Sequence, residues 1–177
     1  MSSVGWYAVL VGAVAAWRVV ELVLSSRHRR WALAHGGFES GQGHFPAMAA
    51  LHTGLLVGSV VEVVVADRPF RPVLGWSMLA VLVLTQALRL WCMATLGRQW
   101  NTRVVVVPGA PRVTGGPYRW LPHPNYLVVV VEGLALPLVH GAWVTAVVFT
   151  VLNAVLLLGF RIPAEDAALQ SLRTADR

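Results

Sequence analysis

The sequence contains no lysine, a single cysteine (Cys92) and few charged residues of either sign. Charged residues make up 12% of the chain, against the roughly 25% that is usual for a soluble domain. One cysteine cannot build a disulfide framework or a metal-ligand cluster, so we expect no metal site. A Gly-x-Gly-x-x-Gly turn after a strand is also missing, which argues against a Rossmann domain.

Hydrophobic residues, in contrast, make up 56% of the chain and gather in long apolar segments. A bilayer core requires about 20 apolar residues per helical span. We therefore predict an all-α polytopic membrane protein, a single domain over residues 1–177, with N-terminal helices up to residue 96 and a motif region over 97–177. Five transmembrane helices are expected at about residues 4–24, 46–66, 73–96, 124–139 and 142–160. The last two would form a hairpin with His140 and Gly141 at its tip.

The basic side chains are all arginine, and the formal net charge is +6. In a soluble protein this balance would suggest nucleic acid, but here the arginines lie mostly between apolar segments, where they set membrane topology. In the five-span arrangement one side holds Arg27, Arg29, Arg30, Arg98, Arg103, Arg112, Arg119, Arg161, Arg173 and Arg177, and the other holds Arg68 and Arg71. We predict an outside N-terminus, a cytoplasmic C-terminus and active site, and no nucleic-acid partner.

Several ionisable residues fall inside the predicted spans: Arg18, Glu21, His52, Glu62, Arg89 and Glu132. A charge near the bilayer centre costs about 2.5–3.5 kcal/mol even on lenient scales, so these groups should face the bundle interior and find partners. Arg18 and Glu21 are three residues apart and can pair on one helix face. Glu62, Arg89 and Glu132 are candidates for an interhelical set. Such charges fit either a polar cavity or structural ion pairing, and the sequence leaves both open.

The loop over residues 97–123 carries most of the chemistry-bearing residues outside the spans. A β-like run at Val104–Val107 is followed by a series of glycines and prolines typical of turns. The loop ends in Gly116-Pro117-Tyr118-Arg119 and runs into His123-Pro124-Asn125-Tyr126. Pro124 suits the first turn of a helix, and His123 would stand beside free backbone N–H groups that can hold a carboxylate.

A second polar cluster follows the last predicted span, where Arg161 is followed by Glu165 and Asp166. Arg161 and Glu165 are four residues apart, so a continuing helix would place them on one face. Pro163 is compatible with this arrangement if a new helix begins there.

Together the two clusters resemble the isoprenylcysteine carboxyl methyltransferase family of integral membrane methyltransferases. The family pattern is Gly-Pro-Tyr-Arg, then Arg-His-Pro-x-Tyr, an apolar helical hairpin, and Arg-x-x-x-Glu-Glu, and the resemblance covers about residues 90–170. The N-terminal half, with Arg18-Val19-Val20-Glu21-Leu22, Gly43-His44-Phe45-Pro46 and His52, is similar to a bacterial branch associated with type III polyketide synthases.

The resemblance implies a site for S-adenosylmethionine at the cytoplasmic interface of a bacterial membrane, open to the bilayer for a lipophilic small-molecule acceptor. Tyr118, Arg119, His123, Pro124, Tyr126 and Glu165 would hold the cofactor. Arg161 would polarise the acceptor oxygen, with Glu165 as the second catalytic residue. Glu132, His52 and Asn101 are the residues predicted to bind the acceptor.

The chain departs from the family pattern at two positions. Pro122 stands where the family has an arginine that serves the carboxylate substrate, and Val128 stands where a glycine is expected. Loss of the arginine favours a neutral or phenolic acceptor, such as an alkylpyrone or alkylresorcinol. A prenylcysteine carboxylate and a phospholipid amine remain alternative acceptors, and a small transporter or membrane scaffold is the alternative from another class.

Overall fold

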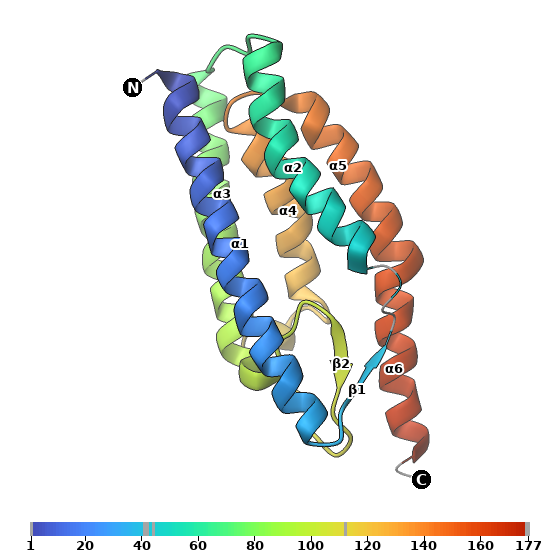
Figure 1. Cartoon of the computed structure of the whole chain (residues 1–177). Helices are drawn as coiled ribbons and strands as arrows, with labels where there is room; N and C mark the ends of the chain where they lie inside the picture. The colour runs from blue at the N-terminus through green and yellow to red at the C-terminus, as the bar shows by residue number, and fades with distance from the viewer. Residues whose placement is uncertain (1, 41–42, 44, 112, 176–177) are drawn as a thin grey trace.

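The molecule is an elongated helical bundle with its termini at opposite ends (Figure 1). The computed structural model describes residues 2–40, 43, 45–111 and 113–175. Its α-helices are α1 (Ser3–Ala34), α2 (Phe45–Val65), α3 (Pro72–Leu96), α4 (Pro124–Leu138), α5 (Trp143–Leu156) and α6 (Ile162–Ala175). Shorter elements are β1 (Phe38–Ser40), β2 (Val104–Val106), the 3-10 turns η2 (Gly97–Gln99) and η3 (Gly116–Arg119), and the π turn η4 (Leu157–Arg161). Helix α4 lies in the middle, with α1 and α3 on one side and α2 and α5 on the other.

Four helical segments are long and apolar enough to cross a bilayer: Ser3–Ala34, Phe45–Val65, Pro72–Gln99 and Trp143–Glu165. They match four of the five predicted spans, and α1 continues past the predicted end near residue 24. The fifth predicted span corresponds to α4, which has 15 residues and so measures about 22 Å, against a hydrocarbon core of about 30 Å. The integral membrane prediction is confirmed, whereas the count of five spans is not.

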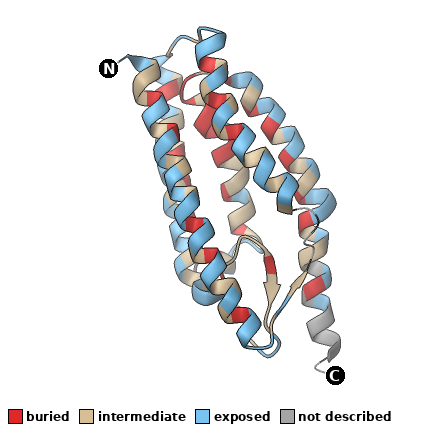
Figure 2. Cartoon of the chain, viewed as in Figure 1, coloured by how far each residue is buried: buried red, intermediate tan, exposed pale blue. Residues whose placement is uncertain are grey.

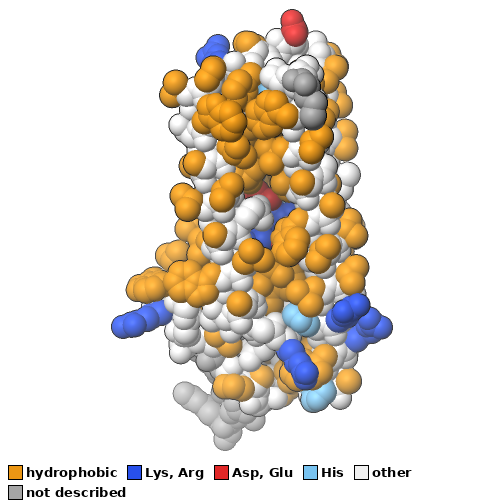
Figure 3. Space-filling view, turned by 90° about the vertical axis from the view of Figure 1, so that its left-hand side faces the viewer, with side chains coloured by type: hydrophobic (Ala, Val, Ile, Leu, Met, Phe, Trp, Pro, Cys, Tyr) orange, Lys and Arg blue, Asp and Glu red, His pale blue; other side chains and the backbone are white. Residues whose placement is uncertain are grey.

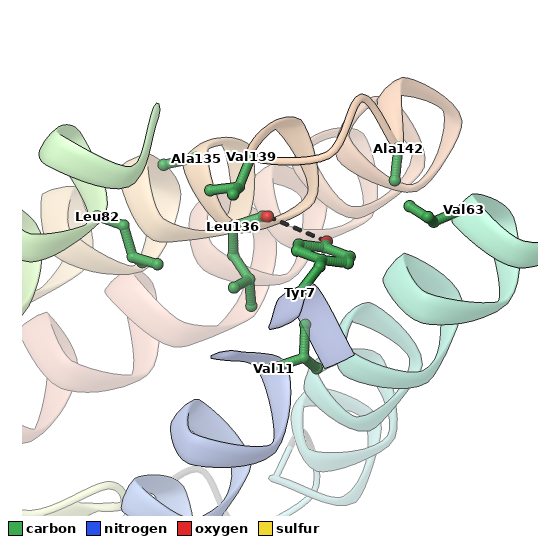
Figure 4. Close-up of a cluster of buried hydrophobic side chains, with 8 residues drawn as sticks. All are labelled: Tyr7, Val11, Val63, Leu82, Ala135, Leu136, Val139 and Ala142. Carbon is green, nitrogen blue, oxygen red and sulfur yellow. Dashed lines mark hydrogen bonds between the residues drawn. The ribbon is translucent and has the colours of Figure 1, made fainter. Parts of the chain in front are cut away.

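The surface of the bundle is apolar, as lipid contact requires. Large hydrophobic side chains such as Leu84 (70% exposed) and Val73 (85% exposed) point outward, and orange side chains are spread along the face seen in Figure 3. Buried residues form a narrow interior strip between the helices (Figure 2). At the N-terminal end of this strip, the Tyr7 hydroxyl donates a hydrogen bond to the Leu136 carbonyl at 3.1 Å (Figure 4). This bond ties α1 to α4.

Helix α5 runs on through the π turn into α6, so one nearly continuous rod passes from the hairpin tip to the C-terminal end (Figure 1). The predicted tip is confirmed, because α4 ends at Leu138, α5 begins at Trp143, and Gly141 between them adopts a φ of +74°. Pro163 is the second residue of α6, but no separate helix starts there, because the π turn runs into α6 without a break. Its missing N–H therefore interrupts the helical hydrogen bonds next to the π turn.

The only departure from an all-α fold among the described residues is a two-stranded antiparallel sheet. Strand β1 lies between α1 and α2, and β2 follows α3 in the long loop, with Phe38 opposite Val106 and Ser40 opposite Val104. The predicted β-like run is therefore confirmed as β2. The sheet closes the C-terminal end of the bundle beside α6.

The intramembrane charges divide into two groups rather than one set. Arg18, Glu21, Arg89 and Glu132 form a buried ion cluster, which we call the charge ring. Glu62 does not join it, so that part of the prediction is wrong. Its carboxylate instead pairs with Arg68 at 3.0 Å and accepts hydrogen bonds from the backbone N–H groups of Val144 and Thr145. Those N–H groups lack helical partners at the start of α5, which explains the attraction.

Candidate functional site

A cavity of about 560 Å³ lies at the C-terminal end of the bundle. Its wall comes from the end of α1, the long loop, β2, η3, the start of α4 and the start of α6. The lining comprises Ala32, Leu96, Arg98, Gln99, Trp100, Asn101, residues 103–107, Ala110, Pro111, Val113, Thr114, Tyr118, Pro122, His123, Asn125, Tyr126, Arg161 and Glu165. The two motif clusters found in the sequence thus share one cavity.

The hydroxyl of Tyr126 joins the two clusters directly. Arg161 donates from Nε to the Tyr126 hydroxyl at 3.2 Å, and that hydroxyl donates to Oε2 of Glu165. We call Tyr126, Arg161 and Glu165 the tyrosine junction. A guanidinium on one side and a carboxylate on the other fix the direction of the phenolic O–H.

The π turn sets the position of Arg161. It ends at this residue, and α6 begins at the next one, so Arg161 and Glu165 point to the same side, as predicted. Arg161 is only 7% exposed, which is unusual for an arginine and requires polar partners. The side chain of Asp166, the second acid of the pattern, lies outside the described residues.

The first turn of α4 brings His123 to the same carboxylate. His123 occupies the N-cap position, and Pro124 is the first helical residue, as predicted. Nδ1 of His123 lies 3.5 Å from Oε1 of Glu165, and its ring stacks on that of Tyr126 with centroids 5.1 Å apart. Free N–H groups and the helix dipole make this helix start favourable for a carboxylate.

Tyr118 lines the cavity from η3, whereas the neighbouring Arg119 is exposed outside the lining. Burial raises the pKa of the Tyr118 phenol above its ordinary range, and nearby Cys92 acts in the same direction, so the phenol stays protonated and can donate. Gly116 begins this turn with a φ of +53°, and a Cβ there would meet the Thr95 side chain. The close approach and the positive φ both require glycine.

The three residues predicted to bind the acceptor do not gather at the cavity. Asn101 lines the cavity, and its Oδ1 accepts hydrogen bonds from Ser25 Oγ at 2.6 Å and from the Arg103 backbone N–H at 3.1 Å. Glu132 belongs to the charge ring. Nδ1 of His52 lies 2.9 Å from the Met48 carbonyl, and its ring packs edge-on against Phe149. Within the described part of the chain, neither Glu132 nor His52 lines the cavity.

A carboxylate that the sequence did not single out holds the cavity wall together. Glu39 of β1 accepts from Arg29 of α1 at 2.6 Å and from Arg103, beside β2, at 2.7 Å. Burial alone would raise the pKa of Glu39, but hydrogen bonds from Arg103 and Arg29 outweigh it and hold the pKa below its ordinary value of 4.5. The signal available was a lone acid in a short loop that follows three arginines, Arg27, Arg29 and Arg30, since these offer a carboxylate cationic partners.

Glu39→Gln is expected to lower the melting temperature at neutral pH by roughly 2–4 °C, which corresponds to about 1 kcal/mol, because both arginine partners are partly solvated and screened. Since the folded-state pKa of Glu39 is lowered, its stabilisation is complete above pH 4.5 and is lost as the pH falls through the folded-state pKa. The difference in melting temperature between wild type and variant should therefore shrink as the pH falls below 4.5. A constant difference down to pH 3 would contradict this assignment.

A thermal-unfolding series in detergent from pH 3 to 7 measures the effect. Asp67→Asn is the matched control, since Asp67 is exposed at the opposite end of the molecule, with a φ of +46° that asparagine tolerates. This control should leave the melting temperature unchanged at every pH.

Comparison with known proteins identifies the family and two relatives. A model of the isoprenylcysteine carboxyl methyltransferase (ICMT) family matches residues 78–171, which include both motif clusters and the hairpin. The uncharacterized protein YpbQ of Bacillus subtilis is 36% identical over 162 residues, covering 91% of this chain and 95% of the relative. An uncharacterized protein of Haemophilus influenzae is 23% identical over 160 residues, covering 90% and 92%. No solved structure matches the chain.

Proposed function

The chain belongs to the isoprenylcysteine carboxyl methyltransferase family of membrane methyltransferases, and from this premise we propose that it moves a methyl group from S-adenosylmethionine to an oxygen of a lipophilic acceptor. The observation that carries the proposal is the tyrosine junction. It joins residues 35 and 39 positions apart in the sequence at the wall of one cavity. A purely structural contact between α4 and α6 would not need a buried arginine facing that cavity.

The cavity residues fit the methyl donor, which supplies a methyl group already activated by its positive sulfonium. A carboxylate suits the N–H groups at the start of α4 beside His123. Glu165 carries a negative charge that suits the cationic part of the donor. The volume of about 560 Å³ lies within the range of small-molecule sites and leaves room for an acceptor head group as well.

Methyl transfer is an in-line displacement, so most of the acceleration should come from positioning. The acceptor O–H loses its proton to water at the membrane interface, and the resulting oxygen anion forms the new bond to the methyl carbon. The carbon–sulfur bond breaks with its electron pair staying on sulfur, which leaves a neutral thioether. The guanidinium of Arg161 would hold the acceptor oxygen as an anion. Tyr126 and Glu165 would keep that guanidinium in place.

A phenolic or enolic polyketide lipid is the acceptor we propose, either an alkylpyrone or an alkylresorcinol. Pro122 lines the cavity at the position where the family has an arginine, so a carboxylate substrate would lose its partner. A phenolate needs only the single cation that Arg161 provides. The valines at residues 104–107, in and after β2, form an apolar part of the wall of the same cavity.

Product mass spectrometry after incubation with methyl-labelled S-adenosylmethionine tests the proposal. The acceptor panel is pentadecylresorcinol, a long-chain alkylpyrone, a farnesylated cysteine and phosphatidylethanolamine. We expect one labelled methyl group on the resorcinol or pyrone oxygen. Label on the cysteine carboxylate or the ethanolamine nitrogen would replace the acceptor assignment, and no labelled product together with no donor binding would overturn methyl transfer itself.

A further inference from the structure

The charge ring joins four charged side chains that do not line the cavity. One oxygen of each carboxylate accepts from both arginines. Oε2 of Glu21 lies 2.6 Å from Nη1 of Arg18 and 3.3 Å from Nη1 of Arg89, and Oε2 of Glu132 pairs with the same two guanidinium groups. The four groups therefore close a ring with no net charge. Its side chains are 21% (Arg18), 3% (Glu21), 3% (Arg89) and 2% (Glu132) exposed.

The ring connects three helices. Arg18 and Glu21 come from α1, Arg89 from α3 and Glu132 from α4. Arg18 and Glu21 are near neighbours on one helix and would satisfy each other without help. Arg89 and Glu132 add a second pair of opposite charges at a depth where an isolated charge is expensive, so their presence needs a reason other than the pairing of α1.

The position of helix α4 gives a reason for the second pair. A helix that spans the bilayer is held at its depth by its own length, but α4 is too short for this. At 15 residues it is too short to match the bilayer, so contacts with its neighbours must set its position along the membrane normal. The Tyr7 bond holds its C-terminal half. Glu132 holds its centre, six residues or about 9 Å along the axis from Tyr126.

We propose that the charge ring is a positioning device, which locks α4 against α1 and α3 and so sets where His123 and Tyr126 meet Arg161 and Glu165. Glu132 and Arg89 are its positioning residues. Within the described part of the chain, none of the four ring residues lines the cavity, so their effect on the site passes through α4. The measurement of turnover rests on the proposed function, whereas the effect of the ring on the position of α4 is argued from geometry alone.

The ring places four charged side chains inside a bundle whose outer surface is apolar. Figure 3 shows acidic and basic side-chain atoms in a hollow about halfway along one face, with orange side chains above and below it. Ion pairs in such a setting require good geometry to offset desolvation, so a buried pair is weak evidence for stability, and in some proteins its role is to fix register. A neutral replacement of one ring pair should therefore leave the protein folded while releasing α4.

The test is the double variant Arg89→Gln/Glu132→Gln, which removes one positive and one negative charge and leaves the Arg18–Glu21 pair intact. The matched control is Glu62→Gln/Arg68→Gln, which removes an ion pair at the end of the molecule opposite the cavity. Turnover is measured with S-adenosylmethionine and pentadecylresorcinol. We expect kcat of the ring variant to fall at least about tenfold, with the donor KM changed less than about threefold, whereas the control keeps kcat within about twofold.

Hydrogen–deuterium exchange over residues 123–130 gives a readout that needs no acceptor. Exchange should be faster in the ring variant than in wild type and unchanged in the control. A ring variant with wild-type kcat and wild-type exchange would overturn the inference, as would equal losses in both variants at equal stability. A wild-type protein without turnover or donor binding would overturn the proposed function instead, and the exchange result would still decide the role of the ring.

Arg89→Lys covers the case in which the double variant does not fold. It keeps the positive charge, but an ammonium lacks the fork that reaches both carboxylates. We expect it to fold and to show an intermediate loss of kcat, about three- to tenfold, with faster exchange at the start of α4. Unchanged kcat and exchange in Arg89→Lys would then count against the ring as a positioning device.

Discussion

Arg161→Ala is expected to reduce methyl transfer about 100-fold or more at saturating donor and acceptor, the size of effect seen when an oxyanion partner is removed from a buried site. Arg161 is 7% exposed and contacts Tyr126 at the cavity wall. Without its guanidinium, the acceptor oxygen has no cation to hold it as an anion. Donor affinity should change by less than about threefold, because His123 and the start of α4 remain.

Steady-state kinetics and calorimetry on the same preparation separate these two effects. Arg68→Ala is the matched control, since Arg68 is an arginine with polar and aromatic partners of its own, Glu62 and Trp143, at the opposite end of the bundle. It should keep turnover within about twofold of wild type. Normal donor binding together with full turnover in Arg161→Ala would show that this arginine does not polarise the acceptor.

Gly133→Val is expected to destabilise the protein by about 3 kcal/mol, the upper end of the range for overpacking a core. Gly133 is buried on α4, and a Cβ there would overlap with Cδ1 and Cε1 of the Phe149 ring on α5. A ring packed between two helices of a tight hairpin has little room to move. A valine therefore has to separate α4 from α5, and the melting temperature should fall by roughly 6–12 °C.

Thermal unfolding in detergent measures this change, with Gly54→Val as the control. Gly54 lies inside α2, and a Cβ there would meet nothing within 4 Å, so the substitution should be close to neutral. Phe149→Leu combined with Gly133→Val should recover part of the lost stability by making room. Equal melting temperatures for Gly133→Val and wild type would show that the hairpin is less tightly packed than the structure has it.

The helices and the motif residues could be predicted because each leaves a local mark in the sequence. Apolar length defined α2 and α3 to within a residue or so, and Pro124 marked the start of α4. The pairing of Arg18 with Glu21 could be predicted from their helical spacing alone. These features depend on short stretches of chain, so a single sequence contains the information.

Features built from distant segments could not be predicted in the same way. Strand β1 has three residues, and its partner lies in another loop more than 60 residues away, so no local pattern marks the pair. Glu62 was grouped with Arg89 and Glu132 by hydrophobic context, yet it caps α5, since an acid serves an unpaired helix start as well as it serves an arginine. Glu39, with its two arginine partners, depends on the same kind of distant contact.

The tyrosine junction stands between these two cases. The resemblance to the family brought His123, Tyr126, Arg161 and Glu165 into one predicted site, and the structure places all four at one cavity. The bonds through the Tyr126 hydroxyl depend on how α6 continues from the π turn, which no spacing rule specifies. The predicted acceptor residues Glu132 and His52 do not line that cavity. An ionisable residue inside a predicted span can be expected to be buried, but its position does not show whether it binds a substrate or pairs with another charge.

Calorimetric titration of the detergent-purified protein with S-adenosylmethionine tests the central claim most directly. Wild-type protein should bind one equivalent. Tyr126→Phe removes the hydroxyl that donates to the Glu165 carboxylate, the group proposed to face the cationic part of the donor, and should bind at least about tenfold more weakly. Ser59→Ala removes a buried hydroxyl that bonds within α2, to the Leu55 carbonyl, and should bind as wild type does. Absence of binding to the wild type, or equal affinity in Tyr126→Phe, would contradict the site proposed for the methyl donor.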